Sequence, residues 1–149
     1  MKRLTAISAI IAIGACLVVA QKKLTLSSLP PAVQAAVQAE AKGAEIKNIG
    51  KETEHGVVQY EIETILNGKH RDFNVDTKGK VLVVEEETTI DVIPTPAKAA
   101  ILKKVGDGKL GTVELFKRGG ETMYEAAYTT KAGKKNEVLV RADGTKTKD

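Results

Sequence analysis

The stretch that decides the fold is Ser28–Glu87, because its pattern occurs twice. It opens with LPPAV (29–33), continues with the alternating run GVVQYEI (56–62) and closes with FNVDTKGK (73–80). The pattern returns 64 positions later in the pairs Pro30/Pro94, Ala35/Ala99, Ala36/Ala100, Gly56/Gly120, Tyr60/Tyr124 and Glu61/Glu125. After a one-residue slip it continues in Gly68/Gly133, Lys69/Lys134, Val75/Val140 and Gly79/Gly144. Identities at turns and core positions predict an internal repeat.

Each repeat is predicted to begin with a helix and to continue as antiparallel strands. In the first, apolar residues at helical spacing precede Gly43, and strands are expected over 44–54, 58–66, 69–76 and 80–88. Asn67-Gly68 is typical of a two-residue hairpin turn, in which both residues have positive φ. The expected fold class is α+β, with two tandem repeats, each one helix packed on a four-stranded antiparallel β-meander.

The two predicted repeats span residues 24–90 and 91–149. The second has smaller core residues and a short, polar last strand over 145–149. Thr95 is expected to cap its helix, with Pro96 at the first helical position. A unit of about 60 residues is marginally stable alone. We therefore expect the repeats to pack together or to share a continuous sheet.

The first twenty residues have the pattern of a secretory signal peptide. Lys2-Arg3 precedes an apolar run from Leu4 to Val19, and small residues at Val18 and Ala20 favour cleavage after Ala20. A second interpretation uses the only cysteine: IGAC (13–16) resembles a lipobox, in which Cys16 would be lipidated. Both interpretations place the protein in the periplasm or outside the cell, with no membrane span after cleavage.

Composition and motifs argue against several function classes. The 149-residue chain has a net charge of +4, but its charges are mixed and aromatic residues make up only 3%, which does not favour nucleic-acid binding. Neither His55 nor His70 belongs to a metal-ligand pattern, and the exported part has no cysteine. Its only serines are Ser27 and Ser28, and helix capping explains at least one of them. We therefore expect no enzyme activity, no metal site and no cofactor.

The residues LP (29–30), AA (35–36), YEI (60–62), NG (67–68), VD (75–76) and GKV (79–81) resemble the PepSY and PepSY-like domains of secreted bacterial proteins. That group includes β-lactamase-inhibitor-like members, and the resemblance covers two tandem copies. The second copy departs from it, with Arg141 where Asp76 stands and Thr145 where Lys80 stands. The resemblance implies a helix-plus-sheet fold, an envelope or extracellular location and binding or restraint of peptidases or other enzymes. It provides no catalytic residues.

The function expected from these observations is non-catalytic binding. A sheet covered by helices on one side has an open opposite face, and strand alternation places a row of residues there: Gln59, Glu61, Glu63, His70, Asp72, Asn74, Met123 and Glu125. The expected partner is an envelope or extracellular peptidase, which the protein would inhibit, or another protein. The alternative is an envelope module that binds a small ligand or a cation through this acidic face.

Overall fold

The computed structural model describes residues 23–54 and 56–147. The predicted signal peptide over residues 1–20, its cleavage site after Ala20 and the alternative lipidation at Cys16 lie outside the described residues. His55 lies outside them as well.

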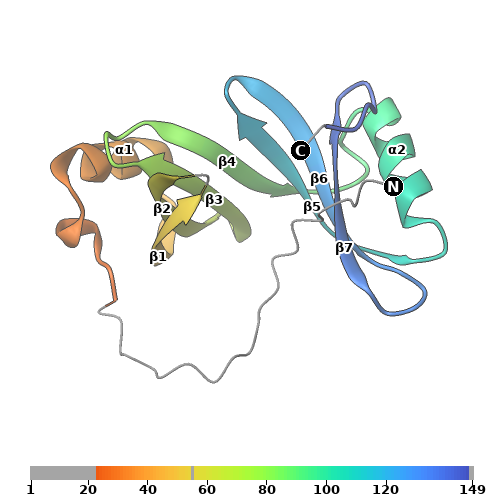
Figure 1. Cartoon of the computed structure of the whole chain (residues 1–149), viewed down its shortest axis with the longest axis horizontal. Helices are drawn as coiled ribbons and strands as arrows, with labels where there is room; N and C mark the ends of the chain where they lie inside the picture. Colours follow the sequence, from red (N-terminus) through yellow and green to blue (C-terminus); the bar gives the residue numbers. More distant parts are fainter. Residues whose placement is uncertain (1–22, 55, 148–149) are drawn as a thin grey trace.

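Two helices and seven strands make up the described chain, together with one 3-10 turn. In chain order they are η1 (Leu26–Ser28), α1 (Pro31–Ala41), β1 (Glu45–Glu54), β2 (Val57–Leu66), β3 (Lys69–Asp76), β4 (Val81–Thr88), α2 (Thr95–Val105), β5 (Lys109–Arg118), β6 (Glu121–Thr129) and β7 (Lys135–Arg141). Figure 1 shows α1 and α2 at opposite ends of the molecule, with the strands between them.

The predicted fold class is wrong. The strands do not form two separate four-stranded meanders; they form one antiparallel sheet in the order β1-β2-β3-β4-β5-β6-β7. The junction is the pairing of β4 with β5, which runs from Val83 opposite Arg118 to Thr88 opposite Val113. A meander that ended at β4 would leave a row of backbone N–H and C=O groups unpaired, and pairing with β5 satisfies them.

The second half of the chain contributes three strands to the sheet, not four. After β7 the chain turns at Gly144 and forms only an isolated bridge between Val140 and Lys146. The residues from Thr145 onward are polar and have little apolar surface to bury. The described residues up to 147 therefore form no fourth strand there.

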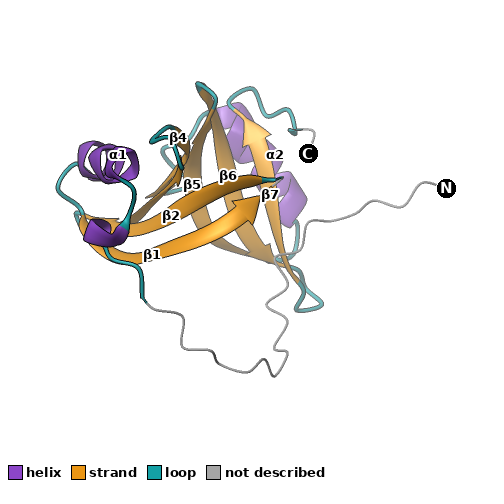
Figure 2. Ribbon diagram, turned by 60° about the vertical axis from the view of Figure 1, so that its left-hand side comes forward, coloured by secondary structure: helices purple, strands orange, loops and turns teal. Residues whose placement is uncertain are grey.

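Both helices pack on the same face of the sheet. Val33 and Val37 of α1 are fully buried against Ile62 and Phe73, and Ile101 of α2 packs in a second core with β5, β6 and β7. The uninterrupted register between β4 and β5 joins the two cores on one side of the sheet. Figure 2 shows the strong twist of the sheet between the two helices.

The two helices do not begin with the capping residues predicted from the sequence. Pro30 and Pro94 precede α1 and α2, and neither helix has a side-chain cap hydrogen bond. Thr95 is the first residue of α2 rather than its cap. Ser28, predicted to cap a helix, instead closes η1 by exchanging hydrogen bonds with Thr25.

Two turn glycines approach the helix starts closely. Gly79 and Gly144 both have positive φ, +85° and +82°. A Cβ added at Gly79 would lie 2.6 Å from the carbonyl oxygen of Ala32, and one at Gly144 would lie 2.7 Å from that of Pro96. Only glycine accommodates both the backbone conformation and the contact.

Two local sequence predictions are confirmed. The odd spacing of Ile46 and Ile49 predicts a bulge or a change of face near Asn48, and the β1–β2 register shifts between Ile46 and Asn48. Asn67 and Gly68 have φ values of +53° and +81°, as the predicted hairpin turn between β2 and β3 requires.

Candidate functional site: the open face of the sheet

The candidate site is the sheet surface opposite α1 and α2, which we call the open face. No described helix packs against it. The strand alternation and the pairing register place the following residues on it: Glu61 and Glu63 of β2, Asp72 and Asn74 of β3, Val83 and Glu85 of β4, Glu114, Phe116 and Arg118 of β5, Met123 and Glu125 of β6, and Glu137 and Leu139 of β7.

The eight residues predicted to line the sheet all fall on this face, but two of them are buried. Gln59 is only 2% exposed, and its side-chain amide donates hydrogen bonds to Glu52 and Glu54 at 2.8 and 2.9 Å. Met123 is buried under its neighbours. The accessible members of the predicted set are Glu61, Glu63, His70, Asp72, Asn74 and Glu125.

Neighbouring side chains position the polar groups of β2 and β3. Asp72 accepts a hydrogen bond of 2.8 Å from the backbone N–H of Thr64. The side-chain amide of Asn48 donates to Glu63 at 2.9 Å, and that of Asn74 donates to Glu52 at 3.2 Å. These contacts hold β1, β2 and β3 in register and orient their polar groups away from the helices.

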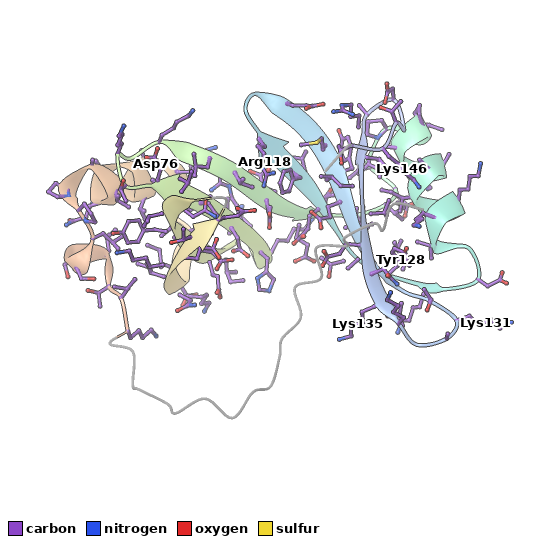
Figure 3. The ribbon with its side chains drawn as sticks, viewed as in Figure 1. Asp76, Arg118, Tyr128, Lys131, Lys135 and Lys146 are labelled. Atoms are coloured by element: carbon purple, nitrogen blue, oxygen red, sulfur yellow. The ribbon has the colours of Figure 1, made fainter. Side chains whose placement is uncertain are left out.

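A small apolar cluster lies at the centre of the open face, across β4, β5 and β6. Val83, Phe116 and Met123 are each no more than 6% exposed, and Leu82 and Leu139 pack against them. The guanidinium of Arg118 lies 5.0 Å from the centroid of the Phe116 ring. Figure 3 shows Arg118 between β4 and the last strands, near the middle of the molecule. Apolar and aliphatic atoms thus exclude water from the middle of this face.

Sequence reasoning missed Phe116, Glu85 and Glu114. A register shift in β5 between Leu110 and Val113 reverses the alternation, so that Phe116 points to the open face. Glu85 stands in the run Glu85–Glu87, which gives no sign of which member faces which way. A search for an odd spacing of apolar residues in β5, Leu110 to Val113, would have indicated the shift.

Two carboxyl groups beside the apolar cluster have strongly raised pKa values. Burial, followed by the charges of Glu114, Glu125, Asp72 and Glu61, raises the pKa of Glu85 from 4.5 to about 7. Burial also raises the pKa of Glu125 to about 7, with further contributions from Glu137 and Glu114. Glu85 lies opposite Phe116, and Glu125 lies opposite Leu139. The apolar cluster therefore removes water from both groups.

Three further carboxyl groups on this face also have raised pKa values. Burial is the largest cause that raises the pKa of Glu61, of Asp72 and of Glu114, and charge repulsion from neighbouring carboxylates adds to it. The Thr64 hydrogen bond and His70 oppose the rise at Asp72. Among the described residues, none of these five groups forms an ion pair with a lysine or arginine.

On the helix face, in contrast, the buried charged groups form ion pairs. Arg71, only 3% exposed, donates to the backbone carbonyl of Glu40 at 2.7 Å and also pairs with the Glu40 carboxylate. Its Nε donates to Glu86 at 3.0 Å, and Lys117 lies 3.5 Å from the same carboxylate. Burial alone would raise the pKa of Glu86, but these two cations outweigh it and lower the pKa.

Several lysines lie beside α2 and at the β6–β7 end of the molecule. Lys103 and Lys104, in the last turn of α2, line a shallow hollow with Lys146. Figure 3 shows Lys146 beside α2 and Lys131 and Lys135 at the β6–β7 end of the molecule. An open face rich in carboxylates therefore coexists with an overall charge of +4.

The described residues contain neither a cluster of metal-ligating side chains nor a membrane-spanning helix. They contain no group of three or more His, Cys, Asp or Glu side chains placed to hold a metal ion. No helix within the described ranges is long and apolar enough to cross a membrane.

Known proteins resemble this chain in structure but not in sequence. No protein-family model and no curated protein matches it. A "DUF2874 family protein" from Bacteroides ovatus has a TM-score of 0.64 at 12% identity, over 80% of this chain and 85% of its own. A "putative periplasmic" protein from Bacteroides eggerthii has a TM-score of 0.66 at 15% identity, over 80% and 86%. A "BLIP-like protein" from Bacteroides fragilis has a TM-score of 0.60 at 19% identity, over 80% and 84%.

At these identities the likeness concerns the fold alone. The fold is compatible with the PepSY-like and BLIP-like resemblance suggested by the sequence. The chain thus has the fold of these Bacteroides proteins.

Proposed function

We propose that this protein is a non-catalytic periplasmic or secreted binding protein whose open face holds a protein partner. The observation that supports it best is the open face itself: both helices lie on one side of the seven-stranded sheet, and on the other side half-buried carboxyl groups without a Lys or Arg partner among the described residues surround an apolar cluster. Carboxyl groups with raised pKa values gather preferentially at functional sites. Two structural neighbours are described as a putative periplasmic protein and a BLIP-like protein, which is consistent with this proposal.

The finer part of the proposal is that the partner is an envelope peptidase or another enzyme, which the protein inhibits. A rigid sheet suits this role, and each strand from β1 to β7 pairs with its neighbour in the sheet. A surface that is already ordered loses little conformational entropy when a partner binds. The protein would then act by covering the partner rather than by chemistry of its own.

The test is capture from envelope extract of the source organism by immobilised protein. The wild type is compared with Glu61→Lys/Asp72→Lys on the open face and with Asp91→Lys/Asp107→Lys, which makes the same charge change on the helix side. We expect one enriched protein that the first variant loses and the second retains. Inhibition of its activity at equimolar protein would support the finer part. Equal capture by all three proteins, or no capture above an unrelated secreted domain, would contradict the proposal.

A further inference from the structure

The open face has a charge pattern that its own residues do not neutralise. Half-buried carboxylates follow one another across four adjacent strands, with Asp72 opposite Glu85 and Glu114 opposite Glu125. The register between β4 and β5 places Glu87 opposite Glu114 as well. Like charges directly opposite each other destabilise a sheet. The fold thus tolerates an arrangement that a cation from outside would improve.

Building on the proposed function, we propose that the partner of the open face is a protein surface that presents Arg or Lys side chains to Glu85, Glu114 and Glu125. A neutral or acidic partner would bury these carboxylates without compensation, which is unfavourable. A cationic partner instead gains from charge complementarity over the same area.

The chain itself shows how a cationic side chain sits on this face. Arg118 lays its guanidinium over the ring of Phe116 and lowers the pKa of Glu125 through its charge. Arg and Lys side chains combine an apolar stem with a charged end. On this face the charged end would reach the half-buried carboxylates that flank the apolar cluster.

Binding of such a partner is expected to release protons. Near neutral pH, Glu85 and Glu125 are about half protonated, because the pKa of each is about 7. The groups that face Glu85 are Asp72, Glu61, Glu114 and Glu125, and those that face Glu125 are Glu114, Glu137 and Arg118. An added cation lowers both pKa values, so binding displaces the protons.

The affinity for a cationic partner therefore rises with pH. Between pH 6 and pH 8 the ionised fraction of a group with a pKa of 7 rises about tenfold. We expect the affinity to rise by up to about tenfold for each of the two carboxylates that the partner contacts.

The experiment uses two disulfide-closed hairpin peptides as probes. One carries Arg and Phe on its exposed face, and the other has Glu in place of every Arg. The protein is produced from the full chain, so that the cell removes any leader. Titration calorimetry at pH 6 and pH 8, in buffers of different ionisation enthalpy, gives the affinity and the number of protons released. NMR shift changes locate the peptide on the open or the helix face.

Glu85→Gln/Glu125→Gln is the test variant, and Asp91→Asn/Asp107→Asn makes the same charge change on the helix side. We expect the Arg peptide to bind on the open face, to release protons and to bind more tightly at pH 8. The test variant should weaken this binding and abolish its pH dependence, whereas the control should preserve both. Thermal unfolding checks that each variant is folded.

Equal binding of the two peptides, binding on the helix face, an unchanged pH dependence in the test variant or no binding of the Arg peptide would each overturn the inference. A failure of the proposed function can be distinguished from a failure of this inference. If the Arg peptide behaves as expected but no protein from the extract depends on the open face, the proposed function fails and the charge preference stands. If a native partner needs the open face but binds equally at pH 6 and pH 8, only the further inference fails.

Discussion

Glu85 and Glu86 are neighbours in β4, yet they occupy opposite environments. Glu86 points to the helix face, where Arg71 and Lys117 pair with it and its pKa is lowered despite burial. Glu85 points to the open face, where burial and four other carboxylates raise its pKa to about 7. Residue type and strand are the same, so the difference arises from the burial of each carboxyl group and from the charges around it.

This comparison shows that the two faces of the sheet differ in how their buried charges are paired. The helix face pairs its buried charges, as a stable core requires. On the open face, the five carboxyl groups with raised pKa values form no ion pair with a lysine or arginine of the described chain. Groups that are unfavourable for stability persist most readily where they are needed for an interaction. The predictions below test whether the two faces differ in this way.

The largest effect is expected from Arg71→Met. The substitution leaves the Glu40 and Glu86 carboxylates without their buried partner and breaks the link between α1 and β3. The free energy of unfolding should fall by about 3 kcal/mol. Urea unfolding followed by circular dichroism measures it. Arg118→Met, on the open face, is the matched control and should cost no more than about 1 kcal/mol. Equal losses in the two variants would remove the distinction between the faces.

Glu86→Gln should give a smaller loss that depends on pH. The folded-state pKa of Glu86 is lowered, so its contribution is present above its usual value of 4.5 and is lost as pH falls through the lowered pKa. We expect the variant to be less stable by about 1–2 kcal/mol at pH 7. At pH 3 the difference should shrink. A loss of the same size at both pH values would show that the ion pair is not its cause.

The double variant Glu85→Gln/Glu125→Gln should change the free energy of unfolding in the opposite direction to Glu86→Gln. The folded-state pKa values are raised, so the unfolded chain ionises first and stability falls as pH rises from about 4.5 to about 7. Removing both charges should therefore stabilise the protein at pH 8, by about 1 kcal/mol in total once solvent screening is allowed for. Thermal unfolding at pH 4 and pH 8 measures this. A variant less stable than the wild type at pH 8 would contradict the account of the open face.

The smallest effect concerns Arg118, a cation that reaches this acidic row. Arg118 lowers the pKa of Glu125 by its charge. Arg118→Gln should therefore raise that pKa further, and the side-chain carboxyl signal in a carbon-13 NMR titration reports it. Arg141→Gln, whose arginine pairs with Glu121, is the control. An unchanged Glu125 titration in Arg118→Gln would show that the guanidinium does not act on this carboxyl group.

Much of the local structure followed from the sequence. Gly43, Asn67 and Gly68 indicated where a helix ends and a hairpin turns, because few residue types adopt positive φ without strain. The alternation in β2 correctly placed Tyr60 and Ile62 in the core and Glu61 on the opposite face. Both signals depend on neighbours in the chain, and neither needs long-range contacts.

The pairing of distant strands did not follow from the sequence. The sequence left open whether the two halves pack together or share a continuous sheet, and the pairing of β4 with β5 decided for one sheet in place of two meanders. The shift between Leu110 and Val113 then moved Phe116 to the open face. Register between strands depends on contacts far apart in sequence, where local patterns give little information.

The sequence by itself determined the helices, most strand positions and the polar row on one side of the sheet, because these depend on local backbone preferences and on residue periodicity. Only the tertiary structure decided that Glu85 and Glu125 flank one apolar cluster while Glu86 meets Arg71. Carboxyl groups of one residue type thereby acquired opposite pKa shifts, since the ionisation of a group is set by the water and charges that the fold places around it.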